Sequence, residues 1–173
     1  VTKDATIREI HHRVKNNLQT VAALLRLQSR RITHPEARGA LSQAMSRVQA
    51  IAVVHEILSQ AYEEVVAFDD VADRMLRMVG DLASTRGKVV AQRVGSFGDV
   101  PADVATSLSL VITELCQNAV EHGHGQGSGR VDVVPTHTEA GLVVDVLDDG
   151  QGLPEGFSLA GSRSLGLSIV STL

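Results

Sequence analysis

The first third of the chain carries a stripe of apolar residues with a helical period. Over residues 6–32 these residues recur at alternating steps of four and three, a spacing that keeps them on one helix face. The mean step is nearer 3.5 than 3.6 residues, as in coiled coils and helix bundles. The stripe consists of Ile7, Val14, Leu18, Val21, Leu25 and Ile32, with His11 and Gln28 in the two remaining places.

A second apolar stripe follows a short break. The break contains Pro35, which disfavours the helical conformation in the residue before it. Two long helices with a short connection predict an antiparallel hairpin. A lone hairpin leaves its apolar seam half exposed, so we expect a homodimer in which two hairpins form a four-helix bundle. The second stripe consists of Leu41, Ala44, Val48, Ile51, His55, Leu58, Tyr62 and Val65.

The pattern changes near residue 66, which predicts two domains, residues 1–66 and 67–173. In the second we expect helices over 71–83, with Asp69 or Asp70 as N-cap, and over 102–122, with Pro101 near its start. Strands are expected over 88–94, 130–134 and 142–147, the last two joined by residues 135–141. A final helix is expected from residue 165. Helices alternating with strands indicate an α+β class.

Composition and charge narrow the classes of function. Aromatic residues make up only 2% of the chain and the net charge is −4, which argues against a base-stacking platform and a globally basic nucleic-acid binder. The single cysteine, Cys116, excludes internal disulfides, and its apolar helical setting predicts a buried thiol. No apolar run is long enough to span a bilayer. The chain begins at Val1, so we expect a fragment of a longer, cytoplasmic protein.

Three short motifs of the second part carry candidate chemistry. Glu114 and Asn118 are spaced i,i+4, so both can face one site, and an amide oxygen suits a hard cation such as magnesium. Asp148 follows an apolar strand and can accept a hydrogen bond from an exocyclic amine. Gly150 and Gly152 allow the backbone to approach a flat ligand closely.

The third motif, residues 164–168, is a turn of small residues that opens a helix. A helix N-terminus presents free N–H groups to phosphate. Each motif alone fits an ordinary polar face, tight turn or helix start, whereas their order and spacing together favour a nucleotide site. We place His122, at the end of the long helix, and Arg163, before the small-residue turn, with them as candidate nucleotide-binding residues.

Taken together, the motifs resemble the GHKL ATP-binding fold, with Glu114 and Asn118 as N box, Asp148, Gly150 and Gly152 as first glycine box, and Gly166 in the second. The first helix resembles the phosphoacceptor segment of HWE-like sensor histidine kinases, and the second is similar to that class around Ser46, Arg47, His55 and Glu56. The resemblance covers residues 8–173. It implies a helical hairpin followed by a GHKL-type α/β sandwich that stops inside its last helix, with ATP as substrate and Mg2+ held through Asn118.

The resemblance also selects the phosphoacceptor. His11 lies on the apolar seam, whereas His12 lies one place off it, toward solvent, so His12 is the candidate nucleophile. A carboxylate on its other ring nitrogen would orient it. The usual acidic residue after the phosphoacceptor is Arg13 here, which leaves Glu9, or Glu56 of the returning helix, as the candidate base.

Asn16, one turn after His12, matches the place where many histidine kinases have an amide or hydroxyl side chain. In those kinases this side chain orients the water molecule that dephosphorylates the response regulator. A competing interpretation makes Asn16 polar surface of the hairpin.

The resemblance predicts autophosphorylation of His12 by ATP and phosphoryl transfer to an aspartate on the receiver domain of a response regulator. The chain is most similar to cytosolic actinobacterial kinases that partner an RNA-binding antiterminator regulator. Two alternatives stay open: a GHKL serine kinase of the anti-sigma type, which needs no phosphoacceptor helix, and a nonenzymatic dimer whose nucleotide site gates partner binding.

Overall fold

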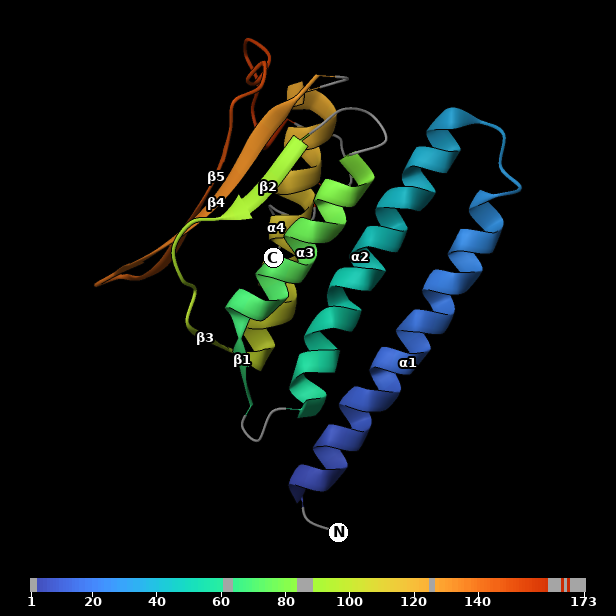
Figure 1. Cartoon of the computed structure of the whole chain (residues 1–173), viewed down its shortest axis with the longest axis vertical. Coiled ribbons are helices and arrows are strands. Elements are labelled where there is room, and N and C mark those ends of the chain that lie inside the picture. Colours follow the sequence, from blue (N-terminus) through green and yellow to red (C-terminus); the bar gives the residue numbers. More distant parts are fainter. Residues whose placement is uncertain are drawn as a thin grey trace.

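The computed structural model describes residues 3–60, 64–83, 89–124 and 127–161, together with Gly166 and Ser168. Helices α1 (Lys3–Ser29) and α2 (Pro35–Gln60) form the predicted antiparallel hairpin, with α1 at the outer edge of the molecule (Figure 1). The second helix ends earlier than the stripe predicted. Val65 lies in strand β1 (Val65–Ala67), so its assignment to the helical stripe is wrong, and Tyr62 lies outside the described residues.

The two helices meet through a seam close to the predicted one, with two differences on α1, because Val21 and Gln28 are both exposed. Ala22 is buried in the seam, whereas Val21, which the pattern placed there, is 42% exposed. A helix of 3.6 residues per turn rotates past a strict 3.5 repeat, which moves Val21 out of the contact. Val21 instead belongs to a group of exposed apolar side chains on α1, here called the outer stripe: Ile10, Val21, Leu24 and Leu27.

Helix α3 (Phe68–Ala83) follows β1 directly. The N-cap prediction for Asp69 and Asp70 is wrong, because both lie inside the first helical turn. Strand β1 pairs antiparallel with a second short strand, β3 (Asp99–Pro101), and the sequence pattern predicted neither. Three-residue strands are too short to show an alternating pattern.

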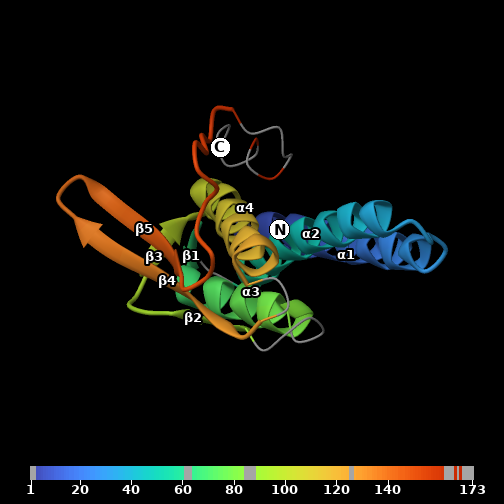
Figure 2. The ribbon, with the colours of Figure 1, turned by 90° about the horizontal axis from the view of Figure 1, so that it is seen from above.

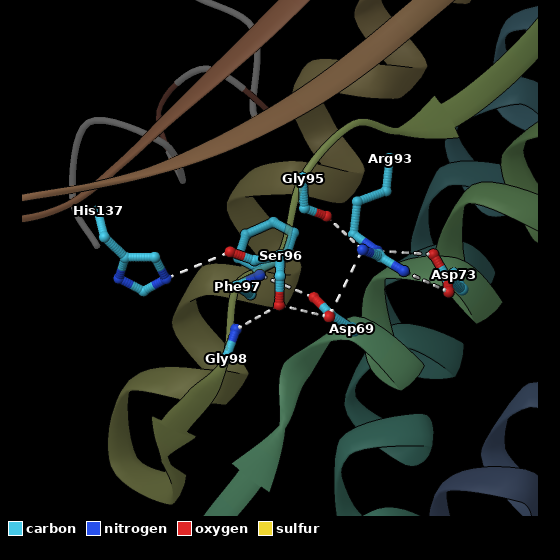
Figure 3. Close-up of polar contacts among 8 residues, drawn as sticks. All are labelled: Asp69, Asp73, Arg93, Gly95, Ser96, Phe97, Gly98 and His137. Carbon is cyan, nitrogen blue, oxygen red and sulfur yellow. Dashed lines mark hydrogen bonds and ion pairs between the residues drawn. The ribbon is translucent and has the colours of Figure 1, made fainter.

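Asp69, at the start of α3, binds the segment that leads to β3 through hydrogen bonds (Figure 3). Its carboxylate accepts hydrogen bonds from the Ser96 hydroxyl and the Phe97 backbone N–H, both at 2.7 Å. Burial alone would raise the pKa of Asp69, but these two hydrogen bonds and the charge of Arg93 lower it. The Phe97 ring is buried against Phe68, at a centroid distance of 4.9 Å. The cluster is completed by Asp73, Gly95, Gly98 and His137.

A three-stranded sheet has the order β2 (Val89–Arg93), β4 (Gly129–Thr138), β5 (Gly141–Asp148). The first pair is parallel and the second antiparallel. The prediction that Pro135 begins the connection is wrong, since Pro135 lies inside β4 and pairs with Val144. The carbonyl of Val133 accepts a hydrogen bond from Val94, on the side of β2. Pro135, two residues later, faces the same side of β4, where β2 has already ended. The backbone N–H that proline lacks would therefore have had no strand partner there.

Helix α4 (Ala102–Asn118) packs with α3 between the sheet and the hairpin, as seen from above in Figure 2. The core includes the fully buried Phe68, Met75, Ile112 and Val131, and α2 contributes Ala50, Val54 and Leu58 to the same cluster. The predicted α+β architecture, a helical hairpin followed by a mixed part, is confirmed. No helix among the described residues is long and apolar enough to cross a membrane.

Candidate active site

The C-terminal end of α4 carries the first candidate residues. Asn118 is the last residue of α4 and is half-buried. The helix does not continue regularly to His122 as predicted, because Ala119–His124 form a π-helical turn (η1) in which His122 is exposed. Such turns are often found at functional sites. Cys116 is buried as predicted, and burial raises the pKa of its thiol to about 12.

Glu114 lies one turn before Asn118 and is held by an arginine from the hairpin. The side chain is 2% exposed, and Arg47 of α2 donates to both carboxylate oxygens, from Nε to Oε1 and from Nη2 to Oε2, the second at 3.1 Å. In the structure the carboxylate of Glu114 therefore faces Arg47. The sequence analysis had expected it to face the same site as Asn118. The sequence singled out Arg47 through the family resemblance of the second helix, but nothing in it indicated Glu114 as the partner.

Gly166, the candidate phosphate-binding glycine, is buried against this ion pair. A Cβ atom built at Gly166 would overlap Glu114 Oε2 and lie 3.7 Å from Arg47 Nη2. A larger residue at this position would therefore displace the Glu114 carboxylate from its place beside Arg47. The structure brings Glu114 and Gly166 together as one site, while Arg163 lies outside the described residues.

The candidate adenine-binding residues lie at the end of β5. Asp148 Oδ1 accepts the Gly150 N–H at 2.8 Å, which closes a tight turn directly after the strand. Gly152 has a φ of +74°, a conformation that favours glycine. Asp149 accepts the Arg130 N–H at 2.7 Å, fixing the turn to β4. Asp148 is exposed, so its second carboxylate oxygen can meet a ligand.

His12 lies on the hairpin and is exposed, as predicted, whereas each candidate base is paired with an arginine. Glu9 Oε1 instead accepts a hydrogen bond from Arg13 Nε at 2.7 Å, and this bond lowers the pKa of Glu9. Glu56 pairs with Arg74 of α3 at 3.0 Å. The side chain that contacts His12 is Asn16, with Nδ2 3.4 Å from Nδ1 of the imidazole.

The neighbouring His11 has a different environment. Its Nδ1 lies 2.9 Å from Nδ1 of His55, so the two rings join α1 to α2 through a shared proton. Burial, followed by the charge of His11, lowers the pKa of His55. Because His11 is engaged inside the hairpin, the structure favours His12 as the residue that a phosphate donor can reach.

His12 and the nucleotide site lie at different levels of the molecule. Arg47 pairs with Glu114 and Gln43 with Glu121, so α2 and α4 run antiparallel. His55, at the level of His11, is eight residues beyond Arg47, about 12 Å along the axis, and Asn118 is four residues the other way, about 6 Å. Helix α2 also lies between α1 and α4, so this arrangement does not bring the imidazole to the nucleotide (Figure 2).

A helical hairpin with an exposed histidine, joined to an α/β part with a glycine-containing turn after β5, is the arrangement expected of a histidine kinase. The comparisons agree: residues 9–83 match the family model described as histidine kinase, and residues 81–173 match the histidine kinase-like ATPase domain. The chain belongs to the histidine kinase family and carries its ATP-using domain.

Individual relatives support this assignment. The chain is 53% identical over 175 residues to sensor histidine kinase PdtaS of Mycobacterium tuberculosis, covering 100% of this chain and 35% of that protein. It is 27% identical to blue-light-activated histidine kinase 2 of Erythrobacter litoralis, covering 98% of this chain and 50% of that protein. The solved histidine kinase domain of Erythrobacter litoralis EL346 matches with a TM-score of 0.65 and 26% identity, covering 97% of this chain and 79% of that one. The chain therefore spans about a third of the length of the first relative.

Proposed function

We propose that this chain is the catalytic core of a two-component sensor histidine kinase that phosphorylates its own His12 from ATP. The observation that carries the proposal is the contrast between two adjacent histidines on α1. His11 is bonded to His55 inside the hairpin, whereas His12 is exposed on a helix outside the ATP-using domain. A serine kinase of the anti-sigma type needs no such helix, which makes that alternative the weaker one.

In the proposed reaction, a neutral ring nitrogen of His12 attacks the γ-phosphorus of ATP. The N–P bond forms as the bond to the β-phosphate oxygen breaks, and ADP leaves. The protein contributes positioning and electrostatic stabilisation. Asp148 accepts the adenine amine, Gly150 and Gly152 admit the base, and Gly166 admits the phosphates, with His122 and Arg163 as further contacts. Asn118 is half-buried, and its amide oxygen is a ligand of the kind magnesium prefers; the ion would neutralise phosphate charge.

The proposal extends to the partners. The outer stripe on α1 is the surface that a second copy would cover, which supports a homodimer through the hairpin. The sequence analysis expected the dimer to cover the exposed seam of the whole hairpin. The apolar face of α2 needs no such cover, because it packs in the core of the second part. The acceptor would be the receiver domain of a response regulator, of the RNA-binding antiterminator type. We also propose that the protein is cytoplasmic. The two domains would divide near residue 66, where β1 follows the hairpin and pairs with β3.

The test is radiolabelling with γ-labelled ATP. We expect acid-labile, base-stable label on the protein, its loss in His12→Gln and its retention in His11→Gln. Label in His12→Gln but not in His11→Gln would reverse the assignment of the two histidines. Acid-stable label on a partner would support the serine kinase, and no label in any sample would support the nonenzymatic module.

A further inference from the structure

Lys15 lies one helical turn after His12, on the side of α1 that also carries the histidine. Three residues advance a helix by about 4.5 Å and return it to within about 60° of the starting direction. Side chains at i and i+3 are neighbours, and helical side chains lean toward the N-terminus, so the side chain of Lys15 leans toward His12. Asn16, which contacts the imidazole, follows on the other flank of the ring. Lys15 and Asn16 therefore flank the exposed histidine.

The environment of Lys15 differs from that of the other charged residues beside His12. Glu9 and Arg13 neutralise each other at a distance of 2.7 Å. Lys15 is half-buried and lies one turn after His11, whose ring joins α1 to α2. A lysine in such a place lays its carbon stem along the hairpin and keeps its ammonium group in water. Within the described part of the chain, no hydrogen bond or ion pair engages this ammonium group.

The remaining acidic residues of α1 and α2 are not placed to pair with Lys15. Asp4 lies eleven residues earlier on α1, about 16 Å by the helical rise. Glu36 lies in the first turn of α2, at the far end of the hairpin. Glu56 is bound to Arg74 of α3. A half-buried cation beside the phosphoacceptor is therefore left to bind an anion that arrives from outside the hairpin.

Phosphorylation of His12 brings such an anion to this place. A neutral imidazole receives a phosphoryl group that carries nearly two negative charges and three acceptor oxygens. A lysine ammonium group is a compact cation with three N–H donors, and hydrogen bonds between charged groups are about twice as strong as neutral ones. Lys15 would therefore interact strongly with the transferring group and weakly with the free imidazole. An interaction that strengthens during the reaction in this way lowers its barrier.

We propose that Lys15 is a catalytic residue whose ammonium group donates hydrogen bonds to the phosphoryl oxygens while the group passes from ATP to His12. The ammonium group keeps its proton throughout, as the N–P bond forms and ADP leaves. Lys15 belongs to α1 and not to the ATP-using domain, so it stays with the phosphohistidine after ADP has left. It therefore favours the product as well as the transition state. This inference rests on the proposed function, because it adds a residue to the same phosphoryl transfer.

The experiment compares Lys15→Met, Lys15→Arg and Arg26→Met in the whole chain. Methionine keeps an unbranched apolar stem and loses the charge, whereas arginine keeps the charge. Arg26 is an exposed cation of the same helix, about 21 Å beyond His12 and outside the roughly 8 Å range of screened charges.

With γ-labelled ATP, we expect Lys15→Met to lower kcat for autophosphorylation by at least about tenfold, the loss of one charge-assisted hydrogen bond. KM for ATP should change less, because Lys15 lies outside the ATP-using domain. Lys15→Arg should keep most of the rate, and Arg26→Met should behave as the unmodified protein. An unchanged kcat in Lys15→Met would overturn the proposal, and so would an equal loss in Lys15→Met and Lys15→Arg.

The reverse reaction measures the effect on the product. Phosphorylated protein, freed of ATP, is mixed with excess ADP, and the label that remains on His12 at equilibrium is compared with the ATP formed. Because Lys15 favours the phosphohistidine, this ratio should be at least about fivefold lower in Lys15→Met than in the unmodified protein. The same ratio in both proteins would contradict a contact between Lys15 and the phosphoryl group.

Phosphoramidate, which phosphorylates histidine without an enzyme, keeps one outcome independent of the ATP site. Phosphorus NMR then follows the phosphoryl group on His12 through its titration, and His12→Gln identifies its signal. A nearby cation favours the doubly charged form, so this signal should titrate at lower pH in the unmodified protein than in Lys15→Met. If ATP labels no sample, the proposed function fails and this titration alone decides the inference. Identical titrations in the two proteins would overturn it.

Discussion

At the scale of single residues, the side chain that contacts Nδ1 of His12 is that of Asn16. An amide NH2 facing Nδ1 fits an imidazole whose proton is on Nε2, and a half-turn of the amide lets its oxygen accept the proton of Nδ1. The second arrangement leaves Nε2 with its lone pair free for phosphorus. With Glu9 on Arg13 and Glu56 on Arg74, we propose that the amide takes the orienting role that the sequence analysis gave to a carboxylate.

The first prediction concerns this amide. Asn16→Ala removes the group that selects the imidazole tautomer, so autophosphorylation should slow by about tenfold, less than the roughly 10²–10⁴-fold of a group that transfers the proton itself. Nitrogen NMR of the His12 ring should show the tautomer ratio change as well. Asn17→Ala, which alters a neighbouring exposed amide, is the control. If only the loss of phosphate from the partner aspartate slows, Asn16 orients water there, as the sequence suggested; if nothing changes, it is surface.

Asp148 gives a second prediction at this scale. Asp148→Asn keeps an oxygen that can accept the Gly150 N–H, so the turn after β5 survives while the charge is lost. Losing a charge-assisted hydrogen bond to adenine, about 1.5–3 kcal/mol, should weaken ADP binding roughly tenfold or more. Calorimetric titration with ADP measures this directly. Asp145→Asn, an exposed aspartate on the same strand, should bind normally. Equal affinities in both variants would remove Asp148 from the site.

At the scale of elements, α1 has two apolar faces, one against α2 and the other formed by the outer stripe. Leu24 is 57% exposed, so Leu24→Glu leaves the isolated hairpin intact but buries a charge if a second copy covers the stripe. We expect the variant to be monomeric by light scattering, and the unmodified protein dimeric. Gln19→Glu, at an exposed position about 140° from Leu24 round the helix, should remain dimeric. An unmodified protein that is monomeric at all concentrations would reject the dimer.

The hairpin should also respond to pH through its histidine pair. Burial lowers the pKa of His55 from 6.5, so the unfolded chain takes up this proton at higher pH than the folded chain. The contribution of His55 to stability is complete above pH 6.5 and declines as the pH falls through the lower, folded value. His55→Gln should therefore lose less stability than the unmodified protein between pH 7.5 and 5.5 in urea unfolding. His34→Gln, on an exposed residue between the helices, should lose as much as the unmodified protein.

At the scale of the whole molecule, the sequence predicted what regular patterns encode. Both helices of the hairpin, α4 and three strands follow from apolar periodicity, and the helix ends differ by a few residues. The pattern could not show β1 and β3, which are too short to alternate. The partnership of Arg47 with Glu114 joins residues 67 apart and depends on how α2 docks, which no local pattern contains. Glycine spacing located Gly150, Gly152 and Gly166, but only the fold shows that Gly166 is limited by the ion pair.

The shared core makes a final prediction about the two parts of the chain. Leu58 of α2 is 5% exposed and packs in the same cluster as Phe68 and Val131 of the second part. Leu58→Ala removes buried volume from that common core, so it should cost about 2–5 kcal/mol and speed exchange in α2 and in β4 together. Leu25→Ala, on α1 at its seam with α2, should speed exchange in the hairpin only. If Leu58→Ala sped exchange in the hairpin but not in β4, the hairpin and the second part of the chain would unfold independently.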